Sequence, residues 1–452
     1  LIGENQDTVF LVDSRDYLDA YGNAVRKLND REAALTAGIS LEEEDYRNLQ
    51  TVRGAARHLS KRWENTVFIT RAEKGGLVCK GTEIFELPGF HLTKEIDTVG
   101  AGDAVFAGIA AGYAAGLSEE KSLILGSFAA GITIQKLFQT GTASEEEIRS
   151  FAADPEYALR PEKALSPRGA EYWKDSEIEL VSGRSPEKPA YAIFDNDGTV
   201  SSLRQGWESV MEPVMMESVL GSAADRVGES EYGRLQEEVK DYIDKTTGIR
   251  TIVQMEGLVD MVRKWGFVPR DQVLTASEYK KIYLDRLQER IEQRKAKIER
   301  GELDRTDFLI KGALDLIKRL SASGVRLFLA SGTDDEAAKR ESELLGYAKY
   351  FNGGIFGAQD VLDQDPKKIV LDSIIDKIDA KGNSQIVCFG DGPVEIRETW
   401  KKGGFSVGVA SDEKRRFGLN TEKRKRLVYA GADVIIPDFS QSARLCEFLG
   451  LA

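Results

Sequence analysis

The chain has 452 residues, 41% of them apolar and 30% charged, with a formal net charge of -13 at pH 7. This size and composition predict a globular protein of two or three domains and exclude a disordered or fibrous one. The negative charge argues against binding to nucleic acid or to an acidic membrane, no apolar run predicts a membrane span, and the scattered cysteines predict no disulfide framework, so a reducing, cytoplasmic location is expected.

The first part of the chain predicts an α/β domain. Residues 8–152 alternate short apolar runs, such as VFLVD and TVFIT, with helical stretches, which is typical of parallel strands joined by crossover helices. We therefore assign residues 1–152 to this domain. Within it, residues 97–103 read DTVGAGD and precede a helix dense in small residues.

The DTVGAGD stretch predicts an anion site. Gly100, Ala101 and Gly102 let backbone N–H groups converge at a helix N-terminus, where the helix dipole favours negative charge. Asp103 would face that site, and a carboxylate there can take the proton from an alcohol that attacks a phosphoryl group. The competing interpretation is a glycine-rich helix start that serves only close packing.

Two flanking patterns accompany this stretch. Asn29 and Glu32 form an Asn-x-x-Glu pair, and the run VFIT ends at Thr70. In this order the three patterns resemble the carboxyl half of the ribokinase-like (PfkB) sugar kinases, especially the kinase domain of heptose-phosphate enzymes. The resemblance implies ATP as phosphoryl donor, Asp103 as catalytic base, an anion hole at residues 100–102, and Asn29 and Glu32 organising Mg²⁺ and phosphate.

The first domain departs from this kinase family in two respects. Ala72 falls where the family usually has glycine. The family's amino half, with its sugar-binding glycines, is expected before Leu1, so a longer native protein is expected. The alternative is a domain retained for packing or as a non-catalytic scaffold.

The segment from residue 153 to residue 190 predicts an interdomain linker, because its periodicity lapses and five prolines fall among charged residues. A second α/β domain is expected from Tyr191 onwards, where an apolar run begins.

That apolar run, YAIF, leads into DNDGT at residues 195–199. Residues i and i+2 of a strand point to one side, so Asp195 and Asp197 would project together where α/β sheets place their ligands, and Gly198 permits a sharp turn. With a cation beside it, Asp195 could attack phosphorus, while Asp197 exchanges protons with the leaving oxygen and with water. The plain alternative is an acidic turn after a buried strand.

Residues 201–320 contain few strand-like runs and many helical ones, which predicts a helical insertion after DNDGT. The charged stretch at residues 279–300 mixes both signs, so we expect a solvated helix face rather than a coiled coil or a nucleic-acid contact. The basic tetrad KRKR at residues 423–426 is likewise expected on a helix surface.

Polar groups also accompany the later apolar runs. Ser331 ends VRLFLAS, Asp391 ends SQIVCFGD with Glu395 nearby, and Lys367 and Lys368 lie between the two runs. A hydroxyl and an ammonium group can hold a phosphate, and carboxylates can hold a divalent cation. The adjacent lysines leave open which of them would do so.

Together with DNDGT, these groups resemble the four motifs of the haloacid dehalogenase superfamily, in order over residues 190–450. The resemblance implies a Rossmann-like core at residues 191–200 and 321–452 and a cap at residues 201–320 that closes over small substrates, with Arg250 a candidate substrate contact. It also implies Mg²⁺ and these roles: Asp195 as nucleophile and metal ligand, Asp197 as general acid/base and metal ligand, Asp391 as metal ligand, Glu395 as direct or outer-shell ligand, Thr199, Ser331 and Gly332 as phosphate-holding groups, and Lys367 or Lys368 as the active-site lysine.

The sequence thus predicts a Mg²⁺-dependent phosphatase, acting on a small phosphorylated substrate such as a sugar phosphate, fused to an ATP-dependent carbohydrate kinase domain. The second aspartate of DNDGT favours a phosphatase over a dehalogenase. The alternatives are a phosphomutase, which hands the phosphoryl group to a sugar hydroxyl, and a phosphatase with a non-catalytic kinase-like scaffold. The exact substrates, and whether the protein forms a homodimer, stay open.

Overall fold

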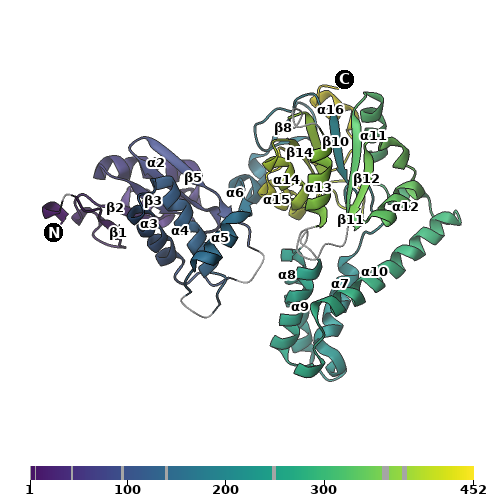
Figure 1. Ribbon diagram of the computed structural model, residues 1–452, viewed down its shortest axis with the longest axis horizontal. Coiled ribbons are helices and arrows are strands. Elements are labelled where there is room, and N and C mark those ends of the chain that lie inside the picture. Colours follow the sequence, from purple (N-terminus) through teal and green to yellow (C-terminus); the bar gives the residue numbers. More distant parts are fainter. Residues whose placement is uncertain are drawn as a thin grey trace. The chain divides into compact units, whose positions relative to one another are not determined.

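The computed structural model describes residues 2–5, 7–41, 44–92, 96–137, 141–246, 251–358, 366–378 and 384–451. The chain divides into two compact units, Leu1–Leu165 and Ser166–Ala452, and Figure 1 labels their elements. None of the described helices combines the length and the apolar character that crossing a membrane requires.

The first unit is built on a sheet of five strands in the order β1-β2-β3-β4-β5. The first three strands are parallel and the last two are added antiparallel. The strands are β1 (Leu11–Asp13), β2 (Val25–Asn29), β3 (Val67–Thr70), β4 (Gly76–Lys80) and β5 (Glu83–Leu87). A separate pair joins β6 (Gly89–Phe90) to β7 (Tyr157–Ala158).

Strand β3 illustrates how this sheet is covered on both faces. Val67 and Ile69 belong to one apolar cluster and Phe68 to another, as the alternation of a strand requires. The helices of the unit are α1 (Asp30–Thr36), α2 (Leu49–Trp63), α3 (Ala101–Ala114), α4 (Glu119–Thr133), α5 (Glu145–Ala153) and α6 (Pro161–Leu165).

Helices α3 and α4 pack with their backbones in close contact. A Cβ added at Gly108 of α3 would lie 2.5 Å from the Cα of Gly126 in α4, so the small residues after DTVGAGD serve this approach. The predicted helix dense in small residues is therefore present, and part of its composition has a packing explanation.

The second unit has a sheet of eight strands in the order β12-β11-β10-β13-β14-β15-β9-β8. The six strands from β12 to β15 in that order are parallel, whereas β9 and β8 are antiparallel additions. The strands are β8 (Glu171–Tyr172), β9 (Glu179–Leu180), β10 (Tyr191–Asp195), β11 (Arg326–Asp334), β12 (Gly354–Ala358), β13 (Ile386–Gly390), β14 (Phe405–Val409) and β15 (Val434–Ile436).

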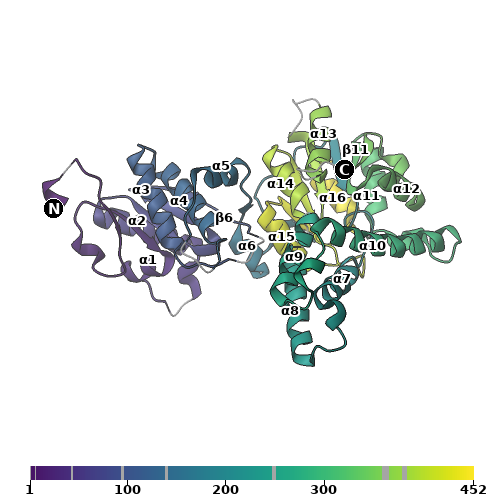
Figure 2. The same cartoon turned by 60° about the horizontal axis from the view of Figure 1, so that its bottom comes forward.

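Within the described residues of this unit, six α-helices accompany the sheet and four more form the inserted cap. The core helices are α11 (Ala313–Ala322), α12 (Asp335–Leu345), α13 (Pro366–Lys377), α14 (Pro393–Lys401), α15 (Thr421–Ala430) and α16 (Ser442–Phe448). The cap helices are α7 (Glu208–Leu220), α8 (Glu229–Thr246), α9 (Thr251–Trp265) and α10 (Ala276–Glu299), and they gather on one side of the unit (Figure 2).

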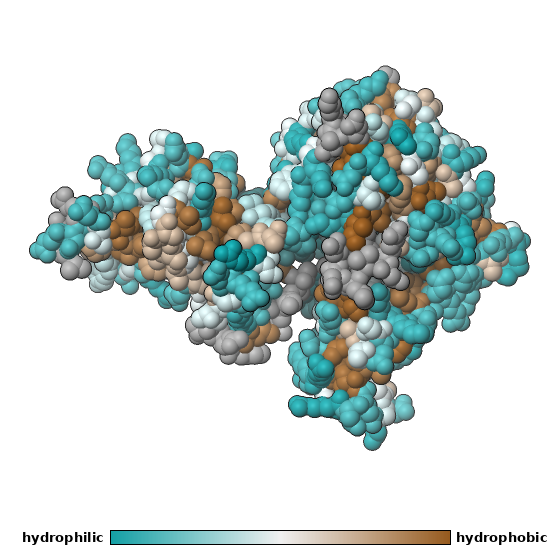
Figure 3. Space-filling model, in the orientation of Figure 1, coloured by the Kyte–Doolittle hydropathy of each residue, from teal (hydrophilic) through white to brown (hydrophobic). Residues whose placement is uncertain are grey.

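The long helix α10 buries a single stripe of residues. Tyr279, Tyr283, Leu287 and Ile291 are buried and recur every fourth residue, while the residues between them are largely polar. Hydrophilic residues dominate the face of the molecule seen in Figure 3, and apolar ones show only in patches. The prediction of a solvated outer face for residues 279–300 is confirmed.

The segment predicted as a linker, residues 153–190, is built into both units. It contains β7 and α6 of the first unit and β8 and β9 of the second, and the boundary between the units falls after Leu165. Strands of two residues carry no detectable period, which is why the sequence pattern lapses there. At the other predicted boundary, most of α11 lies within residues 201–320, the range predicted as cap, but the helix packs against α16 and β11 of the core.

Candidate active site

The candidate site lies at the carboxyl ends of the parallel strands in the second unit. The chain passes from β10 outward to β11 and β12 and then returns to β13 on the other side of β10. Such a reversal opens a crevice beyond the strand ends, where α/β sheets bind ligands. Asp195 is the last residue of β10, Asp391 directly follows β13, and Ser331 and Gly332 lie in the final part of β11.

Asp195 is buried beside a lysine. It is 2% exposed, and its Oδ1 lies 2.8 Å from Nζ of Lys367, which comes from the first turn of α13. Burial raises the pKa of the Asp195 carboxyl well above its usual value, against the lowering effect of Lys367, and Glu395 and Asp391 raise it further. Additional positive charge beside Asp195 would therefore favour its ionised form.

Lys367 also contacts Glu395, with Nζ 2.9 Å from Oε2. Burial lowers the pKa of Lys367, but the surrounding carboxylates Asp195, Glu395 and Asp391 outweigh burial and raise it. The ammonium group thus stays charged in the site. Lys368 instead faces Glu398 at 3.9 Å and is more exposed, so the structure brings Lys367 rather than Lys368 to the nucleophile.

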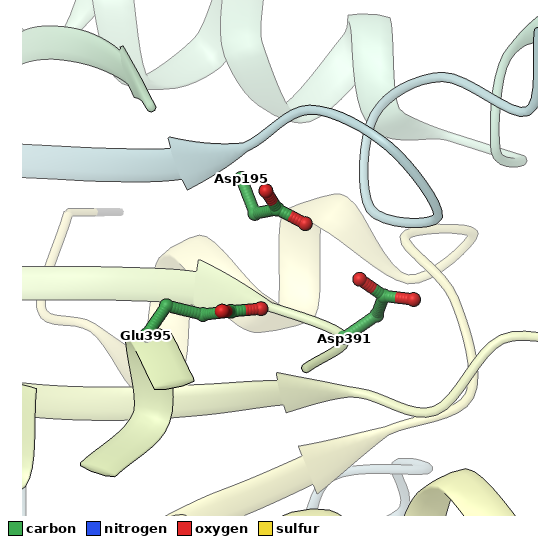
Figure 4. Close-up of side chains that lie close together, drawn as sticks. All are labelled: Asp195, Asp391 and Glu395. Atoms are coloured by element: carbon green, nitrogen blue, oxygen red, sulfur yellow. The ribbon is translucent and has the colours of Figure 1, made fainter. Parts of the chain in front are cut away.

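Three carboxylates converge at this point. Oxygens of Asp195, Asp391 and Glu395 lie within 4.8 Å of one another, and among the described residues they form the one such group with the spacing of a metal site. Figure 4 shows the three side chains reaching toward a common space from β10, from the segment after β13 and from α14.

The oxygen set fits Mg²⁺. The hydroxyl of Thr199 lies 3.3 Å from Oδ2 of Asp195 and 3.4 Å from Oδ1 of Asp391, so these two oxygens face the same point. Burial raises the pKa of Asp391, but Lys423 and Lys367 outweigh it and lower the pKa, which favours an ionised ligand. Buried carboxylate oxygens with surplus negative charge are the donors that Mg²⁺ prefers.

Glu395 is engaged through both of its oxygens. Oε1 accepts a hydrogen bond of 2.6 Å from the backbone N–H of Gly392, as in a capping box at the start of α14, and Oε2 contacts Lys367. A Cβ at Gly390 would lie 2.1 Å from Cγ of Glu395, so glycine at that position admits the longer side chain. Of the two roles left open for Glu395, this geometry favours the outer one.

Gly198 makes room for Asp391. It has φ of +80°, and a Cβ there would lie 2.2 Å from Oδ2 of Asp391. The predicted glycine turn after the two aspartates is therefore present, and it has a second purpose that spacing alone does not indicate.

Asp197 makes its described side-chain contacts with residues outside this carboxylate group. Its Oδ2 accepts hydrogen bonds from Thr333 at 2.9 Å and from Ser331 at 3.4 Å. Its carboxylate is not a member of the three-residue group, although the resemblance implied that Asp197 is a metal ligand. The hydroxyl of Ser331 thus lies at the site but is directed to Asp197, and Arg250 lies outside the described residues.

Two basic residues of α15 were wrongly expected on its surface. Lys423 and Arg424 are 6% and 3% exposed. Nζ of Lys423 lies 2.6 Å from Oδ2 of Asp391 and 2.6 Å from Oε1 of Glu413, and Arg424 pairs with Glu179 of β9. The signal was present in the helical period, because Leu427 and Val428, four residues further on, are buried too.

The first unit holds its predicted residues differently. Asn29 and Glu32 form a capping box at the start of α1, with Asn29 Oδ1 accepting from the Glu32 N–H at 2.8 Å and Glu32 Oε2 accepting from the Asn29 N–H at 2.9 Å. The Asn-x-x-Glu spacing thus also has a purely structural use. Glu32 is partly exposed.

The DTVGAGD stretch forms the start of α3. Gly100 is the N-cap residue with φ of +79°, Ala101 and Gly102 begin the helix, and Asp103 is exposed in its first turn. A buried cation lies next to this helix start: Nζ of Lys27, paired with Asp13 at 2.8 Å, would be 3.0 Å from a Cβ at Gly102. The positive helix end and this lysine make the surroundings suitable for an anion.

Comparison with known proteins divides the chain in the same way. Residues 8–146 match the pfkB family carbohydrate kinases, and residues 190–397 match the haloacid dehalogenase-like hydrolases. A curated relative, the bifunctional protein HldE of Syntrophotalea carbinolica, is 29% identical over 156 residues, which are 34% of this chain and 30% of that protein. The alignment thus spans about a third of the relative's length.

Solved structures resemble each part of the chain. A predicted phosphoglycolate phosphatase from Haemophilus somnus is 16% identical, with a TM-score of 0.39, and the match covers 57% of this chain and 98% of that one. Ribokinase from Thermotoga maritima is 24% identical, with a TM-score of 0.25, and the match covers 29% of this chain and 42% of that one.

Proposed function

Since the chain joins a domain of the pfkB carbohydrate kinase family to a domain of the haloacid dehalogenase-like hydrolase family, we propose that it is a two-activity enzyme whose second unit hydrolyses a small phosphomonoester. A sugar phosphate is the proposed substrate class, because the partner domain belongs to a family of carbohydrate kinases. The cytoplasmic location stays a prediction.

The proposed reaction has two steps. In the first, a carboxylate oxygen of Asp195 attacks phosphorus, the bond from phosphorus to the leaving oxygen breaks, and Asp197 gives that oxygen a proton. In the second, Asp197 takes a proton from water, which attacks the aspartyl phosphate and releases inorganic phosphate and free Asp195. The net reaction is hydrolysis, and both aspartates return to their starting states.

The other residues of the site stabilise charge in this proposal. Lys367, 2.8 Å from Asp195, would neutralise the nucleophile and the oxygens of the transferred group. Asp195 and Asp391 would hold Mg²⁺, with Glu395 orienting Lys367 from behind. When bound, the ion supplies positive charge for the phosphoryl oxygens and for the ionised nucleophile.

The observation that carries the proposal is the convergence on Asp195. One lysine, one hydroxyl and two further carboxylates, from elements far apart in sequence, surround a buried aspartate at the switch point of the sheet. A structural role alone would not require three carboxylates there, since like charges repel and each burial costs free energy.

For the first unit we propose ATP-dependent phosphoryl transfer to a carbohydrate hydroxyl, with Asp103 as base and the start of α3 as anion site. The description of the curated relatives as bifunctional supports a second activity in such proteins. The test is calorimetry with ATP and Mg²⁺ on the full-length protein and on its Asp103→Asn variant, beside ATP turnover on a panel of sugars. Loss of turnover with retained ATP binding is expected, whereas an equal loss of both would contradict the role of Asp103.

The phosphatase is tested by a screen of phosphorylated sugars, glycolate phosphate and nucleotides with the full chain, with and without Mg²⁺. We expect phosphate release that stops on chelation of Mg²⁺. Phosphate release without any dependence on divalent ions would contradict the metal site. A resting phosphorylated enzyme that requires a bisphosphate primer and moves phosphate between hydroxyls would reveal a phosphomutase instead.

A further inference from the structure

A buried ion pair lies directly behind Asp197. Arg204, in the segment that leads from DNDGT into the cap, donates to Glu341 of α12 through Nε at 3.1 Å and through a terminal nitrogen at 2.7 Å. Glu341 is fully buried, and the Arg204 side chain is 17% exposed. The second neighbour of this guanidinium is Asp197, whose Oδ1 lies 3.8 Å from Nε.

Burying this ion pair costs desolvation free energy, and its paired hydrogen bonds restrict the orientation of the guanidinium. Removing two charges from water is compensated only by good geometry, and the paired bonds of a guanidinium to a carboxylate restrict its orientation as well as its distance. Arg204 is therefore held by hydrogen bonds to Glu341, and its positive charge lies close to the carboxylate of Asp197. The cost of burying such a pair behind one specific carboxylate needs an explanation beyond packing.

The contacts of Asp197 suggest that explanation. Hydroxyls of Thr333 and Ser331 donate to Oδ2, while Oδ1 accepts from the side-chain amide of Asn196 at 3.2 Å and faces Arg204. The side chain of Asp197 is 29% exposed, which leaves it accessible to a substrate oxygen. A carboxylate that must meet a leaving oxygen in one orientation gains from being held at both of its oxygens.

We propose that Arg204 is a positioning residue for the proton transfers of Asp197, and that Glu341 fixes Arg204 for this task. The inference rests on the proposed phosphatase function of the second unit. Arg204 acts through Asp197 and leaves the phosphoryl group to Lys367 and the carboxylate group around Asp195.

A cap residue contacts the same segment, but only through the backbone on either side of Arg204. Arg294 of cap helix α10 donates to the carbonyl of Leu203 at 2.6 Å and to that of Gln205 at 2.8 Å. These bonds reach the main chain beside Arg204, whereas its guanidinium is held by Glu341 of the core. Arg294 provides a matched control, because it is a partly buried arginine that contacts this segment through these two carbonyls and does not contact the guanidinium of Arg204 or the carboxylate of Asp197 in the described structure.

The test compares two substrates that differ in their need for a proton. p-Nitrophenolate departs as a stable anion, whereas a sugar alkoxide must be protonated as its bond to phosphorus breaks. The full chain with Mg²⁺ is assayed for kcat/KM on p-nitrophenyl phosphate and on the sugar phosphate hydrolysed fastest in the screen. The variants are Arg204→Met, Arg204→Lys, Glu341→Gln and Arg294→Met, each checked for folding by thermal melting.

For Arg204→Met we expect kcat/KM on the sugar phosphate to fall by about tenfold or more and kcat/KM on p-nitrophenyl phosphate by less than about threefold. Arg204→Lys should recover part of the loss, because it keeps the charge without the paired geometry. Glu341→Gln should shift the ratio of the two substrates in the same direction. Arg294→Met should leave that ratio unchanged, and the inhibition constant of inorganic phosphate should stay within about twofold in every variant.

Equal losses on both substrates in a folded Arg204→Lys variant, with the wild type active on both, would overturn this inference and leave the phosphatase function standing. A weakened inhibition by inorganic phosphate as large as the loss of kcat/KM would also overturn it, because Arg204 would then bind the phosphoryl group. A wild-type chain inactive on every phosphomonoester would reject the proposed function and this inference with it.

Discussion

The two candidate sites differ in how their charged groups are held. In the second unit Asp195 is 2% exposed and contacts Lys367, while Asp391 contacts Lys423. In the first unit Asp103 is exposed in the first turn of α3, and Asn29 and Glu32 bind each other's backbone. Burial makes the difference, because a buried charge must have a partner, and satisfying all partners together determines where each group lies.

The exposed motifs of the first unit do not by themselves require a ligand. The start of α3 and the capping box of α1 are locally complete, so their side chains need no further contact to be stable. Burial and the neighbouring carboxylates raise the pKa of Asp195 well above its usual value, so added positive charge would favour the ionised form of this side chain. We expect changes to the second site to lower its activity steeply, and changes at exposed positions of the first unit, apart from the proposed base Asp103, to affect only their immediate contacts.

The largest effect is expected from Asp195→Asn. The amide has nearly the same shape but cannot attack phosphorus, so phosphatase kcat should fall by about 10⁴-fold or more. The fold should survive, because Asp195 is buried and its pKa is already raised, so a neutral group is tolerated there. The measurement is phosphate release beside a thermal melt, and a wild-type rate with unchanged Mg²⁺ dependence would contradict the assignment of the nucleophile.

The next effect separates two neighbouring lysines. Lys367→Met removes the ammonium group between Asp195 and Glu395, and kcat/KM should fall by about a hundredfold. Lys368→Met is the matched control, because Lys368 lies 3.9 Å from Glu398 and away from the nucleophile, and its change should stay within about threefold. Comparable losses of kcat/KM in the two variants would contradict the assignment of Lys367 as the active-site lysine.

A smaller effect concerns the turn after Asp197. Gly198→Ala combines a left-handed backbone with a Cβ 2.2 Å from Asp391, and Gly324→Ala has the same φ of +80° with nothing within 4 Å. Gly324→Ala should lower the free energy of unfolding by about 1 kcal/mol and leave activity unchanged. Gly198→Ala should cost about 2 kcal/mol or more and weaken Mg²⁺ activation, as denaturant unfolding and metal titration would measure. An equal loss of unfolding free energy in the two variants would show that the clash with Asp391 does not contribute to the effect of Gly198→Ala.

The smallest effect is a titration in the first unit. Hydrogen bonds from Lys136 and from Ser144 lower the pKa of the partly exposed Glu147 to about 2. Because the folded pKa lies below the ordinary value of 4.5, this contribution to stability is present above that value and is lost as pH falls through about 2. Carboxyl chemical shifts followed by NMR should show this, and Lys136→Met should raise the pKa. A titration midpoint near 4.5 in the wild type would contradict it.

Much of the second site could be predicted from the sequence, because the ends of strands can be recognised there. Apolar runs that end at Asp195, Ser331 and Asp391 had to meet at one edge if the strands were parallel, and they do. The helical cap was predictable from the long helical segment between two strands, although the packing of α11 against the core was not. Short pieces such as β8 and β9 were lost in the predicted linker, because two residues contain no period.

The sequence by itself determined the chemistry available at the strand ends and the presence of a cap, since alternation along strands and periodicity along helices are local properties. Only the tertiary structure decided that Lys367 rather than Lys368 meets Asp195, that Glu395 uses both oxygens on neighbours, and that Lys423 is buried against Asp391. Neighbouring residues of a helix point about 100° apart, so a site residue and a surface residue can be adjacent in sequence. The packing of the helix determines which of the two faces the site.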